Sequence, residues 1–132
     1  IPSPFGSVGH SDGDALIHAV VDALLGAAAL GDIGQFFPSE DETWKGASSS
    51  HFLADTVKRI GDAGFSINNV DATIILQTPK LAEYISQMKY NLAYSMQVDE
   101  SQVSVKATTT DRLGFVGDGS GWAVQAVATL IV

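Results

Sequence analysis

Two histidines and several polar side chains lie close together near the amino end of the chain, in the segment HSDGDALIH. Ser11 and Asp14 have the spacing of a capping box, which predicts a helix that begins near Asp12. Asp14 and His18 are four residues apart, so on that helix they would lie one turn apart on the same side. Imidazole and carboxylate suit zinc or another divalent ion, and a helix amino end suits phosphate. Together with His10, these residues predict a metal or phosphate site.

The helix that would carry this site is strongly apolar. From residue 15 to residue 30 nearly every side chain is apolar, which predicts a helix buried almost all round and ended by Gly31. In that setting His18 could instead be a core histidine whose partner is Asp14 or Asp22. The apolar run is too short and too interrupted for a membrane span. Both interpretations of His18 stay open at this point.

A second group of candidate ligands is the segment KATTTD, which precedes Arg112. Three threonines at the end of a strand, between Lys106 and Asp111, could hold phosphate oxygens and a hard cation. The alternative is that threonines favour strands and that Asp111 begins a turn. A third segment, residues 77–80 (QTPK), could meet a phosphate or a polar ring, and could equally be a plain junction between a strand and a helix.

The pattern of apolar residues predicts the elements that must position these groups. Residues 1–9 are expected to form an irregular loop. After the first helix we expect a helix from Ser48 or Ser49 to Ala63, a strand over 67–77 that is buried from Val70 to Leu76, a helix over 80–96, a strand over 103–109, a Gly-rich loop over 114–121 and a strand over 122–132. This order predicts one α+β domain over residues 1–132, with helices packed on one face of a mixed β-sheet.

Composition limits the partners of the chain. Its 132 residues suffice for one domain with a core, and its net charge of −8 disfavours nucleic acid or an anionic membrane as the main partner. Charged residues make up 17% and hydrophobic residues 45%, which predicts surplus apolar surface in a subunit interface. There is no cysteine, so neither disulfides nor thiol chemistry are available. No signal or transit peptide is visible.

Six motifs, in this order and spacing, resemble one family: HSDGDALIH, DALLGAAALGDIG, FFP, WKGASS, NVDATIILQTPK and VKATTTDRLGF. They are similar to the 2-C-methyl-D-erythritol 2,4-cyclodiphosphate synthases of the non-mevalonate isoprenoid pathway, and to bacterial members most. The resemblance implies a cytoplasmic homotrimer with active sites between subunits, with a plastid location as the alternative. It also implies that 4-diphosphocytidyl-2-C-methyl-D-erythritol 2-phosphate is converted to the cyclodiphosphate with release of CMP.

The resemblance also implies roles for individual residues. His18 would be a zinc ligand, oriented by Asp14, and Asp111 would help to hold Mg²⁺ or Mn²⁺. His10 and Ser11 would lie in a mobile loop that covers the substrate. The substrate and the cytidine pocket would be contacted by Asp32, Gly34, Leu76, Lys80, Leu81, Ala107, Thr108 and Thr109.

Four departures from the family pattern qualify these roles. The Asp-x-His pair that completes the zinc site lies outside the chain, so we expect those ligands, and the strand that carries them, upstream of Ile1. Asp118 stands where an arginine is common, which opposes binding of an isoprenoid diphosphate. Ser39 replaces a common acid, and Asp111 is one methylene shorter than the usual glutamate. Two alternatives to the synthase are a catalytically silent trimer that binds a nucleotide or isoprenoid diphosphate, and a metal-dependent phosphohydrolase.

Overall fold

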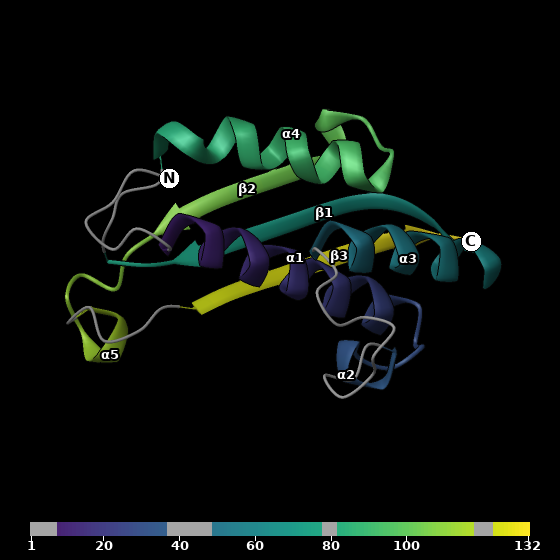
Figure 1. The fold of residues 1–132 in the computed structure, drawn as a ribbon, viewed down its shortest axis with the longest axis horizontal. Coiled ribbons are helices and arrows are strands. Elements are labelled where there is room, and N and C mark those ends of the chain that lie inside the picture. The colour runs from purple at the N-terminus through teal and green to yellow at the C-terminus, as the bar shows by residue number, and fades with distance from the viewer. Residues whose placement is uncertain (1–7, 37–48, 78–81, 118–122) are drawn as a thin grey trace.

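The computed structural model (Figure 1) describes residues 8–36, 49–77, 82–117 and 123–132, and within residues 8–14 it describes the backbone alone. Along these residues the chain forms α1 (Val8–Ala27), α2 (Ile33–Phe36), α3 (Ser49–Asp62), β1 (Ser66–Ile75), the 3-10 helix η2 (Ala82–Tyr84), α4 (Ile85–Met96), the 3-10 helix η3 (Glu100–Gln102), β2 (Val103–Thr108), α5 (Gly114–Gly117) and β3 (Ala123–Ile131). The predicted order of the long helices and strands is confirmed. The short helix α5 occupies the first part of the expected Gly-rich loop.

The described strands form one mixed sheet in the order β2-β1-β3. β1 runs parallel to β2, with Ile75 opposite Thr108, and antiparallel to β3, with Ile75 opposite Ala123. A parallel pair needs a crossover connection, and α4 lies in it. Because β1 and β2 are parallel, their carboxyl ends lie at the same end of the sheet.

The core lies between this sheet and the long helices α1, α3 and α4, which cover one of its faces (Figure 1). Leu16, Val20 and Leu24 of α1 recur every four residues and are buried, because this spacing puts them on one side of the helix. Alternate residues of β1, among them Val70 and Ile74, are buried from the other side. The prediction of an α+β domain with helices on one face of a mixed sheet is confirmed.

The first helix differs from its prediction in two respects. His18, Asp22 and Gly26 form an exposed stripe along α1, so the helix is not buried almost all round. Its many alanines and glycines raise the apolar count without requiring burial. The helix also begins about one turn before the predicted start, because extending a helix costs less than nucleating one. His10 and Ser11 therefore lie within the helix, and the predictions of a Ser11 cap and of a loop at His10 and Ser11 are wrong.

The second face of the sheet is open in the described part of the chain. Along β3 the partly buried side chains alternate with exposed ones, which include Val127 at 65% and Ile131 at 52% exposure. Such apolar groups on an uncovered sheet face are typical of a surface that another molecule covers. None of the described helices is both long and apolar enough to cross a bilayer.

Candidate active site at the carboxyl ends of the parallel strands

The carboxyl ends of β1 and β2 bring together four of the predicted substrate residues. Leu76 continues the pairing beyond β1, where its backbone N–H donates to the carbonyl oxygen of Thr108 over 2.9 Å. Leu76 is buried, whereas Ala107, Thr108 and Thr109 are exposed. The strand ends therefore combine one buried apolar side chain with two exposed threonines, and the Thr108 hydroxyl donates to the Thr109 carbonyl over 3.4 Å. This arrangement suits a polar, phosphorylated molecule that also carries an apolar surface.

The turn after β2 carries Asp111 in an unusual backbone conformation. Asp111 has φ 55° and Arg112 has φ 66°, both in the left-handed region. This region costs most non-glycine residues, Arg112 among them, roughly 1–2 kcal/mol, and aspartate adopts it more readily. Within the turn, the Asp111 N–H donates to Thr109 Oγ1 over 3.2 Å, and the Thr110 hydroxyl donates to the Leu113 carbonyl over 2.7 Å. The threonine hydroxyls thus stabilise part of the turn that presents the exposed Asp111 carboxylate.

Two residues outside the turn hold it in place. Gln77, which follows β1 closely in the chain, accepts a hydrogen bond from the Arg112 N–H at its side-chain oxygen, over 2.9 Å. Gly117 packs so closely on the turn that an added Cβ would lie 2.0 Å from the Arg112 carbonyl carbon. The expected junction at residues 77–80 therefore has a second role, which sequence reasoning missed. A hydrogen bond between residues so far apart in the chain leaves no local signal in the sequence.

Lys106 is paired with a carboxylate of the neighbouring strand. Its Nζ lies 2.9 Å from Asp71 Oδ2, on the open face of the sheet. Strand alternation explains this placement, because Lys106 and Asp71 point away from the helices while Val105 and Ala72 point toward them. The same alternation puts Thr108 on the face that carries Lys106, so the role of Lys106 as a phosphate ligand stays a prediction. The described charged side chains in the turn after β2 are Asp111 and Arg112, and both are exposed.

His18 lies elsewhere, on the exposed stripe of α1. Its ring is 6.0 Å from that of Phe52 between centroids, and Asp22 accepts a hydrogen bond from the Ile33 N–H over 2.7 Å. Its exposure excludes the alternative of a core histidine. Within the described residues, His, Asp and Glu form no group of three or more that could hold a metal ion. The side chains of His10, Ser11 and Asp14 lie outside the described part.

The remaining predicted residues are not gathered at the strand ends. Asp32 Oδ1 accepts a hydrogen bond from the Gln35 N–H over 3.1 Å at the start of α2, which also contains Gly34. In Figure 1, α5 lies at the left end of the molecule, and α2 lies apart from it, below the long helices. Within one chain, Asp32 and Gly34 therefore lie apart from the predicted substrate residues at the strand ends. Lys80, Leu81, Ser39 and Asp118 lie outside the described residues.

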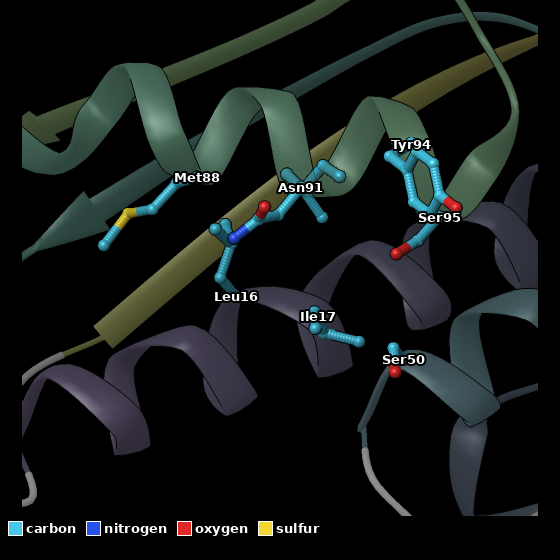
Figure 2. A pocket seen from close by; sticks show the side chains of 8 residues that line it. Leu16, Ile17, Ser50, Met88, Asn91, Tyr94 and Ser95 are labelled. Atoms are coloured by element: carbon cyan, nitrogen blue, oxygen red, sulfur yellow. The ribbon is translucent and has the colours of Figure 1, made fainter.

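A separate groove runs between α4 and the helices α1 and α3 (Figure 2). It has a volume of about 370 Å³, and its lining includes Leu16, Ile17, Ser50, Met88 and Tyr94. None of the predicted site residues is among those that line it. The predicted chemistry therefore belongs to the strand ends and to the exposed stripe of α1, and not to this groove.

Comparison with known proteins gives a consistent result. Residues 1–131 match the YgbB family. The chain is similar to the 2-C-methyl-D-erythritol 2,4-cyclodiphosphate synthase of Desulforamulus reducens, with 52% identity over 98% of this chain and 83% of that protein. The corresponding enzyme of Alkaliphilus oremlandii is 53% identical over 99% of this chain and 83% of its own length.

Solved structures agree with the sequence comparison. The complex of Plasmodium falciparum IspF with CDP superposes with a TM-score of 0.79 at 35% identity, over 92% of this chain and 73% of that one. The bifunctional IspDF of Campylobacter jejuni superposes with a TM-score of 0.83 at 40% identity, over 88% of this chain and 31% of that larger chain.

Proposed function

The chain belongs to the YgbB family, and from this premise we propose that it converts 4-diphosphocytidyl-2-C-methyl-D-erythritol 2-phosphate to 2-C-methyl-D-erythritol 2,4-cyclodiphosphate and CMP. The observation that carries the proposal is identity of about one residue in two to cyclodiphosphate synthases along nearly the whole chain. The family and the main activity predicted from the sequence motifs are thereby confirmed. The bacterial relatives support the cytoplasm as the proposed location.

The reaction asks for positioning more than for covalent chemistry. An oxygen of the 2-phosphate forms a bond to the β-phosphorus, the bond from this phosphorus to the bridging oxygen breaks, and CMP leaves. We propose that the hydroxyls of Thr108 and Thr109 bind phosphate oxygens, while Leu76 and Ala107, with Lys80 and Leu81, contact the cytidine. Alignment of the two reacting groups then supplies much of the rate enhancement.

Divalent metal ions form a further part of the proposal. Mg²⁺ binds one or two carboxylates together with substrate phosphates, and the exposed Asp111 beside the threonine hydroxyls fits that donor set. Such an ion, or Mn²⁺, would neutralise charge on the α- and β-phosphates. Zn²⁺ needs more protein ligands than the described residues gather, so no reaction step is assigned to it. We keep His18 as its proposed ligand, with the others from outside the described residues and Asp14 orienting the ring.

A homotrimer would unite the two separated halves of the site. α2, which contains Gly34 and directly follows Asp32, lies apart from α5 in Figure 1, so a second subunit is proposed to supply these residues to the substrate of the first. The open face of the sheet, with Val127 and Ile131 exposed, supports burial between subunits. Val127→Glu is expected to shift the chain from trimer to monomer in sedimentation velocity. A wild-type chain that is already monomeric at micromolar concentration would contradict the assembly.

The activity is tested by phosphorus NMR with the diphosphocytidyl substrate in the presence of zinc and magnesium. We expect CMP and a cyclic diphosphate from the wild type, and loss of at least about a hundredfold in rate for His18→Ala. His51→Ala is the matched control, because His51 is an exposed histidine on α3. It is expected to retain the wild-type rate.

The alternatives predict different products. CDP binding without turnover would favour the silent binder. Release of inorganic phosphate would favour the phosphohydrolase. Equal losses in His18→Ala and His51→Ala would contradict the ligand role of His18 while leaving the synthase activity in place.

A further inference from the structure

The exposed carboxylate of Asp111 is carried by a backbone that an ordinary residue rarely adopts. Asp111 and Arg112 are consecutive and both left-handed, with φ of 55° and 66°. Two adjacent non-glycine residues in this region persist only where the surrounding structure holds them. The turn therefore needs an anchor, and the anchor decides where the carboxylate lies.

The anchor reaches across from the neighbouring strand. The Gln77 side-chain oxygen lies 2.9 Å from the Arg112 nitrogen and accepts its hydrogen bond. Gln77 is partly buried, and its neighbour Leu76 is fixed to Thr108 through the strand pairing. The side chain thus extends from the ordered end of β1 and ties the turn to the sheet. A return of Arg112 to negative φ would rotate the peptide group that joins it to Asp111 and would break this hydrogen bond.

We propose that Gln77 is a positioning residue of the synthase reaction: by holding the Arg112 N–H it keeps the left-handed turn and sets the place of the Asp111 carboxylate. The inference rests on the proposed function, because it assigns to Asp111 the Mg²⁺ and diphosphate role given above. The role proposed for Gln77 is to hold the turn, without contact to the 2-phosphate or the β-phosphorus of the substrate.

The rival explanation is that Gln77 merely stabilises the fold, and the chain contains a matched control for it. Gln102 is also partly buried and also ties backbone groups together, with its Nε2 donating to the carbonyls of Ile67 and Asn68 over 3.1 and 3.2 Å. It lies at the opposite end of the same strand pair. Its Oε1 also accepts the Asp99 N–H over 3.0 Å, so Gln102→Leu removes more hydrogen bonds than Gln77→Leu without touching the Asp111 turn.

The first measurement is amide hydrogen exchange at Arg112 by NMR. Gln77→Leu removes the acceptor and is expected to speed exchange there about five- to tenfold, as loss of one hydrogen bond does. Gln77→Glu keeps an oxygen acceptor and should preserve protection. Gln102→Leu should leave Arg112 unchanged. Unaltered exchange in Gln77→Leu would overturn the proposal, whether or not the protein has synthase activity.

The second measurement is CDP affinity, with and without Mg²⁺, together with kcat and KM. Gln77→Leu is expected to weaken Mg²⁺-dependent CDP binding about tenfold, and Gln102→Leu to leave it unchanged despite an equal or larger loss of Tm. Adding Arg112→Gly should rescue Gln77→Leu, because glycine adopts the left-handed conformation unaided. Equal losses in both glutamine variants, or no rescue by glycine, would contradict the positioning role. A wild type that fails to bind CDP would contradict the proposed function, and the exchange data would then decide the anchor alone.

Discussion

The two ends of the parallel strand pair are built in opposite ways. Before β2, Asp99 caps η3: its carboxylate accepts the Ser101 N–H over 3.0 Å, and Gln102 completes a capping box. The backbone there is ordinary, with φ of −73° at Asp99. After β2, Asp111 and Arg112 are both left-handed. One end follows local preferences, and the other departs from them.

At each end of the strand pair a glutamine side chain hydrogen-bonds to backbone groups, so the two ends can be compared directly. Gln102 bonds to the N–H of Asp99, which has an ordinary extended conformation, and to the Ile67 carbonyl on β1. Gln77 bonds to the N–H of Arg112, which is left-handed. Strained backbone tends to collect where side chains must be placed for function. The strained end is also the one that gathers the candidate site, with two exposed threonines and Asp111.

The sharpest way to break this comparison is to neutralise one aspartate at each end. Asp111→Asn is expected to lower turnover by about a hundred- to a thousandfold, since it removes the charge proposed to meet the Mg²⁺ ion and the diphosphate. Its stability should change by no more than about 0.5 kcal/mol, because the side chain is exposed. Asp99→Asn should leave turnover unchanged. Similar activity in the two variants would remove Asp111 from the site.

A glycine pair tests whether the strained end is held by close packing. Gly117→Ala would place a Cβ 2.0 Å from the Arg112 carbonyl carbon, so we expect a loss of about 1–3 kcal/mol and displacement of Asp111. Gly61→Ala meets nothing within 4 Å in α3 and should gain about 0.5–1 kcal/mol. Urea unfolding of both variants measures the two effects. If both variants raised the free energy of unfolding, the contact between Gly117 and Arg112 would accommodate an added Cβ without cost.

The helix ends show how far sequence reasoning reached in the fold. α1, α3 and α4 are each followed by a left-handed residue, at Ala29, Gly64 and Gln97. Each end has the same pair of backbone hydrogen bonds, such as Phe65 N–H to the Ile60 carbonyl over 2.9 Å. The ends of α3 and α4 lie within one residue of their predicted places, Ala63 and Met96, whereas α1 ends at Ala27, before the predicted stop at Gly31. At Ala29 the closing hydrogen bonds outweigh the local preference for glycine, so Gly31 was a misleading signal.

Some features of the candidate site were likewise predicted from the sequence, and others were not. The threonines and Asp111 could be found because residue types and strand spacing report on ligands and on strand ends. The pairing of Lys106 with Asp71 could not, because it depends on which strands become neighbours in the sheet. The anchor at Gln77 depends on the same parallel pairing. The spacing of apolar residues and the composition predict where helices and strands lie. Contacts across the sheet depend on which strands become neighbours.

The smallest expected effect belongs to the relaxed end and concerns pH. The hydrogen bond from the Ser101 hydroxyl, followed by that from its N–H, holds the pKa of Asp99 below its ordinary value of 3.8. A carboxyl with a lowered folded pKa adds stability above its ordinary value, and this contribution is lost as pH falls through the folded pKa. Ser101→Ala should raise the Asp99 pKa and flatten the stability profile below about pH 4, whereas Ser86→Ala on α4 should not. Carbon NMR titration of the carboxyl and urea unfolding measure both. An unchanged Asp99 pKa in Ser101→Ala would mean that the hydrogen bond from the Ser101 N–H, and not the one from its hydroxyl, lowers the pKa.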